Sequence, residues 1–257
     1  EGSSGYQGGA ICVEKNFTQS GGSIAVTNSL AEHYGGAIYV FGSFNHSGGS
    51  ISVEGSSAEY HGGAIYVNKD FTQSGGSLAM MNSSAKKSGG AIYVKQNFSH
   101  SGGSISVEGS SAEYHGGAIY VNKDFTQSGG SLAMMNSSAK KSGGAIYVKQ
   151  NFSHSGGSIS VEGSSAAENG GAIRVNKDFT QSGGSLAVTN SSAKVSGGAI
   201  YVVEDFTQSG GSLAVTNSSA RGYGGGLCVR EGMVFTNATA TFSQCHAGLE
   251  GGGIKTS

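Results

Sequence analysis

The sequence predicts an all-β chain that folds as a right-handed parallel β-helix, that is, a β-solenoid of 27-residue coils. A Gly-Gly pair followed by a short apolar run recurs every 27 residues from Gly8 to Gly251, and repeats of this length are typical of stacked coils. The runs alternate with period two, and no stretch between glycine pairs has apolar residues at helical spacing. The 47 glycines disfavour helices further. Crossovers between parallel strands are almost always right-handed, which sets the expected handedness.

The repeat divides the chain into coils without insertions or deletions. Residues 1–7 resemble the end of a coil, residues 8–250 make nine complete coils, and residues 251–257 open a further one. The last complete coil, 224–250, diverges because residues 232–237 replace the usual polar segment with one that contains Met, Val and Phe. We expect an edge coil there, and the partial coils predict that the chain is a piece of a longer precursor.

Each coil predicts short strands in a fixed order. In the coil at 62–88 the halves GGAIYVNKDFTQS and GGSLAMMNSSAKKS are related, and each opens with a glycine pair and an apolar run. Ile65 and Val67 are expected to face the interior, with Tyr66 on the opposite face of the strand. The glycine pairs are expected at corners that need a positive φ or a close approach of two backbones.

Stacking the coils turns equivalent positions into columns, and apolar columns supply the core. Parallel strands about 4.8 Å apart bring like side chains into contact from coil to coil. Columns of Ile, of Val or Met, and of Ala are expected to line the interior. The aromatic core column is predicted to be Phe17, Phe44, Phe71, Phe98, Phe125, Phe152, Phe179 and Phe206.

Two polar columns are expected outside the core. The column that begins at Asn28 holds only Asn or Gly through the regular coils, and both residues tolerate the left-handed conformation of a turn. The column of Glu59, Lys86, Glu113 and Lys140 alternates in sign, which places opposite charges one coil apart. We interpret this alternation as a means of fixing the register between coils.

Composition excludes several classes of partner. The formal net charge of −1 gives no electrostatic reason to expect nucleic acid or an anionic membrane surface. No run approaches the roughly 20 apolar residues that cross a bilayer, so we expect no membrane insertion by this segment.

The sequence predicts no enzyme activity, no metal and no cofactor. His46, His100 and His154 share one column, but they lie two coils apart, roughly 9–10 Å, which is too far for a single metal ion. The column of Asp70, Asp124, Asp178 and Asp205 is interleaved with Ser43, Asn97 and Asn151, so neither a calcium ladder nor the clustered acids of glycoside hydrolysis are expected. The glycine pairs lack the strand–turn–helix context of a phosphate-binding loop.

Three cysteines are candidates for an intersubunit disulfide, namely Cys12, Cys228 and Cys245. Cys12 and Cys228 replace the tyrosine of the IYV strand in the first and last complete coils, eight coils or roughly 38 Å apart, which excludes a bond between them within one chain. An odd number of cysteines leaves at least one unpaired. The alternative is that all three are passive residues of edge coils.

A column of tyrosines is the candidate surface feature, and it is expected to be exposed. Such a row suits lateral association or stacking on carbohydrate, and the alternative is a cross-strand ladder that only stabilises the sheet. The members are Tyr39, Tyr66, Tyr93, Tyr120, Tyr147 and Tyr201, with Arg174 interrupting the column.

The columns carry a resemblance to a known family. Gly-Gly-Ala-Ile recurs at 35, 62, 89, 116, 143, 170 and 197, and Phe-Ser-Gln-Cys-His-Ala at 242–247 leads into Gly-Gly-Gly-Ile at 251–254. This pattern resembles the polymorphic outer-membrane protein repeats best known from chlamydiae, which are marked by GGA[ILV] and FxxN tetrapeptides. The resemblance implies a β-helical passenger, exposed at the surface or secreted, with adhesive or structural work.

The leading expectation for function is a non-enzymatic extracellular structural protein that self-associates head to tail into a filament or rod. Partial coils leave unpaired strand edges, which favour addition of a second copy of the chain as the partner. The alternative is a surface adhesin or autotransporter passenger that binds a protein or glycan of a host or neighbouring cell. Both readings place the chain outside the cell or at its surface.

Overall fold

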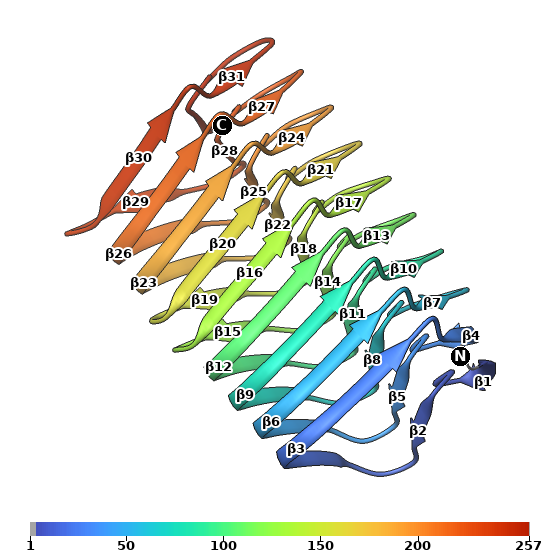
Figure 1. The fold of residues 1–257 in the computed structure, drawn as a ribbon. Helices are drawn as coiled ribbons and strands as arrows, with labels where there is room; N and C mark the ends of the chain where they lie inside the picture. Colours follow the sequence, from blue (N-terminus) through green and yellow to red (C-terminus); the bar gives the residue numbers. More distant parts are fainter. Residues whose placement is uncertain (1–3, 257) are drawn as a thin grey trace.

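The computed structural model describes residues 4–256 and shows coils stacked along one axis into a rod (Figure 1). Every strand pairs in parallel with the equivalent strand of the next coil, 27 residues further along, as in the pairing of Phe17 with Phe44. The stacked strands form three parallel sheets, and no helix occurs in the described residues. The prediction of an all-β parallel solenoid with 27-residue coils is confirmed.

The tyrosine sheet consists of the ten IYV-type strands, which follow the Gly-Gly-Ala corners. Its strands are β2 (Ile11–Val13), β5 (Ile38–Val40), β8 (Ile65–Val67), β11 (Ile92–Val94), β14 (Ile119–Val121), β18 (Ile146–Val148), β22 (Ile173–Val175), β25 (Ile200–Val202), β28 (Leu227–Val229) and β32 (Ile254–Thr256).

The long sheet holds twelve strands, because some coils cross it as one bent strand and others as two. Its strands are β3 (Phe17–Thr27), β6 (Phe44–Glu54), β9 (Phe71–Met81), β12 (Phe98–Glu108), β15 (Phe125–Gln127), β16 (Ser131–Met135), β19 (Phe152–His154), β20 (Ser158–Glu162), β23 (Phe179–Thr189), β26 (Phe206–Thr216), β29 (Met233–Phe235) and β30 (Thr239–Ser243).

The serine–alanine sheet is the third, and most of its ten strands are only two residues long. Its strands are β1 (Ser4–Gln7), β4 (Leu30–Tyr34), β7 (Ser57–Ala58), β10 (Ser84–Ala85), β13 (Ser111–Ala112), β17 (Ser138–Ala139), β21 (Ser165–Ala166), β24 (Ser192–Ala193), β27 (Ser219–Ala220) and β31 (His246–Ala247).

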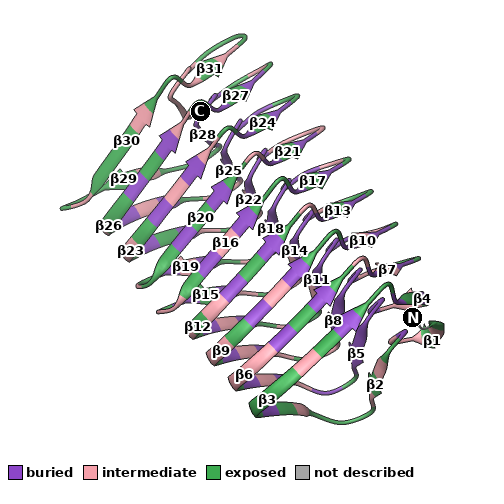
Figure 2. Cartoon of the chain, viewed as in Figure 1, coloured by how far each residue is buried: buried purple, intermediate pink, exposed green. Residues whose placement is uncertain are grey.

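The core is a set of stacked columns, and burial repeats from coil to coil in the middle of the rod (Figure 2). The predicted phenylalanine column is confirmed: its members from Phe44 to Phe206 have no exposed surface, and Phe17 packs against the column while partly exposed. Neighbouring rings stack nearly parallel, with centroids 4.7 Å apart between Phe98 and Phe125 and 4.5 Å apart between Phe125 and Phe152. The apolar interior is therefore continuous along the stack.

The corners explain where glycine and asparagine are required. Asn28 and Gly55 have φ of 51° and 63°, as predicted for the turn column. In the glycine pairs the first residue has the positive φ, 64° at Gly35, and the second is confined by the next coil. A Cβ at Gly63 would overlap the carbonyl oxygen of Gly90.

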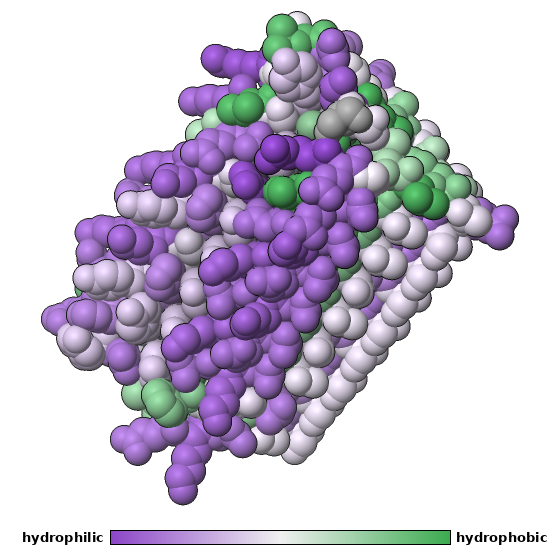
Figure 3. Space-filling model, turned by 180° about the vertical axis from the view of Figure 1, so that it is seen from behind, coloured by the Kyte–Doolittle hydropathy of each residue, from purple (hydrophilic) through white to green (hydrophobic). Residues whose placement is uncertain are grey.

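The charged column pairs opposite charges between coils as predicted. Lys86 Nζ lies 2.7 Å from Glu59 Oε2, and Lys140 Nζ lies 2.8 Å from Glu113 Oε1. Residues of like hydropathy form rows that run along the rod (Figure 3). A feature of one coil therefore becomes a stripe along the rod surface.

Candidate functional site

The rings of the tyrosine column stack without interruption from Tyr39 to Tyr147 on the outward side of the tyrosine sheet. The centroids of Tyr66 and Tyr93 lie 5.1 Å apart and those of Tyr93 and Tyr120 lie 4.8 Å apart, with 2° between the planes in both pairs. Arg174 continues the column, since its guanidinium carbon lies 5.7 Å from the ring centroid of Tyr147 and 5.3 Å from that of Tyr201.

The prediction that this column is exposed is wrong. Tyr39, Tyr66 and Tyr147 are each 7% exposed, Tyr201 is 9% exposed, and Tyr93 and Tyr120 are half-buried. The faces of the rings are covered by the rings above and below them. A column on the adjacent turn covers their sides; its members Tyr34, His61 and His115 have ring centroids 4.8, 4.4 and 4.5 Å from those of Tyr66, Tyr93 and Tyr147.

The burial of the tyrosines favours a ladder that stabilises the sheet over a surface for lateral association or carbohydrate stacking. Desolvation raises the pKa of Tyr66, Tyr93 and Tyr120 above the usual value for a phenol. Carbohydrate stacks on the open face of an aromatic ring, and these faces are occupied by neighbouring tyrosines. The column is therefore better suited to stabilising the sheet than to binding sugar.

The three cysteines lie in different environments, and none is paired. Cys12 is exposed on β2, whereas Cys228 is buried on β28, where burial raises the pKa of its thiol. Cys245 is half-buried and directs its Sγ towards the carbonyl oxygens of Ser243 at 3.4 Å and Val215 at 3.6 Å. Cys12 is therefore the thiol best placed for the predicted intersubunit disulfide, which stays a prediction.

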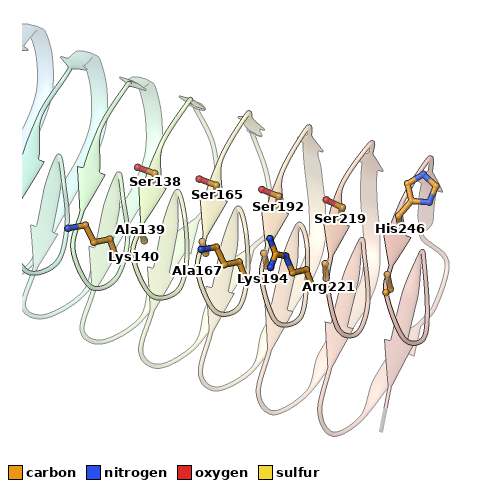
Figure 4. A pocket seen from close by; sticks show the side chains of 15 residues that line it. Ser138, Ala139, Lys140, Ser165, Ala167, Ser192, Lys194, Ser219, Arg221 and His246 are labelled. Carbon is orange, nitrogen blue, oxygen red and sulfur yellow. The ribbon is translucent and has the colours of Figure 1, made fainter.

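A groove that the sequence reasoning did not predict runs along the serine–alanine sheet; we call it the serine groove (Figure 4). Its two parts have volumes of about 820 Å³ over coils near the C-terminus and about 430 Å³ over earlier coils. Serine side chains form one row and basic side chains a second row beside it. The charged residues along both parts are Glu59, Lys86, Glu113, Lys140, Lys194 and Arg221.

Charge is distributed unevenly along the serine groove. In its N-terminal part the carboxylates of Glu59 and Glu113 pair with lysines of the next coils. In its C-terminal part Lys194 and Arg221 line the groove, and no carboxylate lines it among the described residues. The groove thus changes from charge-balanced to positive along the rod, a pattern that suits an extended anionic chain.

A buried polar column, which we call the glutamine–histidine column, lies within the core. Its members are Gln19, His46, Gln73, His100, Gln127, His154, Gln181 and Gln208. Each follows a core phenylalanine by two positions, so strand alternation turns it inward. The sequence reasoning recognised the histidines as one column and rejected a metal site, but it did not place them in the core.

The two ends of the described stack expose side chains that face inward in the other coils. Phe17 and Ile24 in the first coil are half-buried, and Phe235 in the last is 38% exposed, although inward residues elsewhere are almost fully buried. The cause is that no described coil covers them. Phe17, Ile24 and Phe235 are therefore apolar side chains partly exposed at the limits of the described stack.

Other kinds of site receive no support from the described part of the chain. Within residues 4–256, nowhere do three or more His, Cys, Asp or Glu side chains gather as ligands for a metal ion. The described segments include no apolar helix that could span a bilayer.

Comparison with known proteins adds no relative to these observations. No family model matches the chain, and neither the curated proteins nor the solved structures give a match.

Proposed function

We propose that this chain is a non-enzymatic structural protein that self-associates head to tail into a rod or filament, outside the cell or at its surface. The observation that carries the proposal is the repeated stacking contact, because each coil pairs in parallel with the next in the same 27-residue register. In the regular coils inward residues such as Phe44 are fully covered, whereas Phe17 and Phe235 at the two ends are not. A second copy would bury this apolar surface.

The backbone at the ends has the same geometry as the backbone between coils. Phe17 N donates to Ser43 O of the next coil, and Phe41 N donates to Val13 O of the previous one, both at 2.9 Å. By the same repeat, the N–H groups of Glu14 and Met233 point out of opposite ends of the stack. A second copy stacked in parallel therefore offers acceptors in the register that every internal coil uses.

Electron microscopy and sedimentation of purified residues 1–257 over a range of concentrations test this proposal. Nine coils at strand spacing make a rod of roughly 43 Å, so we expect particles whose lengths are multiples of that value and grow with concentration. Exclusively single rods at every concentration would overturn the proposal. Adding a reductant shows separately whether Cys12 secures the joint.

A matched pair of variants locates the contact. Phe235→Glu places a charge on the apolar end, whereas Val195→Glu places the same charge on an exposed residue, 47% accessible, along the side of the rod. We expect Phe235→Glu to yield single rods and Val195→Glu to assemble normally, with unchanged circular dichroism in both. Equal assembly of the two variants would contradict end-to-end stacking.

The resemblance to polymorphic outer-membrane protein repeats supports the cell-surface location. It rests on the Gly-Gly-Ala-Ile tetrapeptides and on the segment at 242–254. The tetrapeptides lie at the corners before the tyrosine sheet, where the first glycine takes a positive φ and the second is confined by the next coil. The role they have in this fold is therefore architectural.

The serine groove favours a second candidate function, that of a surface adhesin or autotransporter passenger bound to an anionic polysaccharide of a neighbouring cell. Lys194 and Arg221 supply positive charge, and the serine hydroxyls beside them supply hydrogen-bond donors at coil spacing. Binding of dextran sulfate but not of dextran is expected, weakened by Arg221→Glu. Lys95→Glu, on a lysine outside the groove, is the matched control, and equal weakening by both would contradict the groove as the site.

A further inference from the structure

The glutamine–histidine column places three ionisable groups in the core. His46, His100 and His154 lie on β6, β12 and β19, in every second coil, and each is at most 1% exposed. Between them stand Gln73 and Gln127, so no two histidines occupy neighbouring coils. A buried side chain that must be neutral thus recurs along the middle of the rod.

The glutamines are adapted to this position because their amides reach the next coil. The Nε2 atoms of Gln73, Gln127 and Gln181 each donate to a serine carbonyl oxygen 31 residues further along, at 3.0 Å. The donor half of each amide is therefore satisfied by the backbone. An uncharged side chain with one well-placed donor is tolerated in the core.

The histidines have no such partner. No ring nitrogen of His46, His100 or His154 makes a well-formed hydrogen bond in the described structure, and the polar interactions of each ring are with the backbone of the glycine pair that follows the histidine. The next coil closes over each ring: a Cβ at Gly76 would lie 2.7 Å from His46 Nε2, and one at Gly130 would lie 2.6 Å from His100 Nε2. A buried polar group without a partner is costly, and an imidazolium there would be costlier still.

The groups around each histidine offer no counter-charge. His46 is flanked by Gln19 on β3 and Gln73 on β9, and the ring of Phe44 lies 6.5 Å away. The groups that favour its protonation are the carbonyls of Gly48 and Gly49, and His100 and His154 face the equivalent glycines. Among the described residues, no carboxylate acts on any of the three rings.

We propose that these three buried histidines make the solenoid acid-labile, so that mild acid opens the coils between residues 35 and 169. Protonation of an imidazole in this column requires the glycine corner of the next coil to move away. The rod is then closed at neutral pH and loosens in its middle when the pH falls.

The sign of the effect follows from the direction of the pKa change. Burial lowers the pKa of all three rings below the value of 6.5 expected in the unfolded chain. The unfolded chain therefore binds more protons, and stability that is complete above pH 6.5 is lost as the pH falls from 6.5 towards the folded pKa. At most, each histidine raises the unfolding equilibrium constant about tenfold per pH unit below 6.5.

Two other histidines also affect stability in acid, and their effect must be distinguished from that of the column. His61 and His115 lie on the turn beside the tyrosine sheet, half-buried, and burial lowers their pKa to about 4. They also favour unfolding in acid. Serine occupies their column at Ser88, Ser142 and Ser196, so the repeat itself accommodates serine at that position.

Denaturant unfolding at pH 7.5, 6.5 and 5.5, followed by circular dichroism, tests the proposal. The chain itself supplies the matched substitution, since glutamine fills five of the eight positions in the column. We expect the wild-type unfolding constant to rise by up to about a thousandfold between pH 7.5 and 5.5 from these three groups. The triple variant H46Q/H100Q/H154Q should lose most of that rise, whereas H61S/H115S should keep it.

Hydrogen exchange locates the opening, and a single variant provides the test if the triple variant does not fold. After correction for the intrinsic pH dependence, exchange at pH 5.5 is expected to rise first in residues 35–169. If the triple variant does not fold, His100→Gln alone should reduce the acid effect by up to about tenfold at pH 5.5. A glutamine variant with the full acid response, or a wild-type rod equally stable at pH 7.5 and 5.5, would overturn the proposal.

Discussion

Replacing Phe125 with alanine tests whether the stacked aromatic column holds the coils together. Phe125 has no exposed surface, and its ring centroid lies 4.7 Å from that of Phe98 and 4.5 Å from that of Phe152. Truncation of a buried phenylalanine costs about 3–5 kcal/mol. Of this, each lost aromatic pair accounts for about 0.5–1.5 kcal/mol. We expect the free energy of unfolding to fall by that total.

Phe17 supplies the matched control because it occupies the same column at the end of the stack. It is half-buried and has a single ring neighbour, Phe44, at 4.7 Å, so Phe17→Ala should cost roughly half as much. Urea unfolding measures both losses, and hydrogen exchange shows whether the coils open together or in sections. A loss below about 1 kcal/mol for Phe125→Ala, or one no larger than that of Phe17→Ala, would refute the reasoning.

Three further predictions concern the corners, the tyrosine column and the thiols. Gly63→Ala should lower the melting temperature strongly, because the added Cβ would overlap the backbone of the next coil. Gly21→Ala is the control, since Gly21 has open space around it, and equal melting temperatures for the two variants would contradict this account. Burial raises the pKa of Tyr93 above 10.0, so stability should fall as the pH rises past 10, and Tyr93→Phe should delay alkaline unfolding seen by circular dichroism. Brief iodoacetamide treatment should alkylate Cys12 well before Cys228, which mass spectrometry distinguishes; faster reaction at Cys228 would show that its burial is wrong.

The fold was predictable because two periods act together in the sequence. The 27-residue repeat determines which residues stack, and the period of two determines which of them face inward. Ile65 and Val67 are fully buried, and Ile65 pairs with Ile38 and Ile92 in the neighbouring coils. In a solenoid a single correctly interpreted coil describes all the regular ones.

The exposure of the tyrosines was not predictable from the same periods. Alternation predicts on which side of a strand Tyr66 or Tyr93 lies, but it does not predict which residues cover that side. The covering groups come from a turn column whose distance from the strand depends on the backbone path through the glycine corners; His61 and Tyr34 belong to it. Side-chain size decides the rest, because these rings are long enough to reach across.

The serine groove arises because neighbouring columns differ in side-chain length. Ser192 and Ala193 are small, and the residue that follows them, Lys194, is long, so a hollow remains beside a raised row. The sequence contains these columns plainly, but a hollow depends on the relative heights of neighbouring columns. Such a difference becomes measurable only once the turns that separate the columns have been placed.

The glutamine–histidine column gives a physical reason for one substitution in the divergent coil at 224–250. Gln208 still donates its Nε2 to Thr239 O in this coil, at 3.1 Å, and the next position of the column is Phe235. Each glutamine therefore depends on the following coil for the acceptor of its amide. Phenylalanine needs no hydrogen-bond partner, and its partly exposed ring makes this end apolar. Replacement of glutamine by phenylalanine at this position therefore removes a donor that would need an acceptor, and it adds apolar surface where a second copy is proposed to stack.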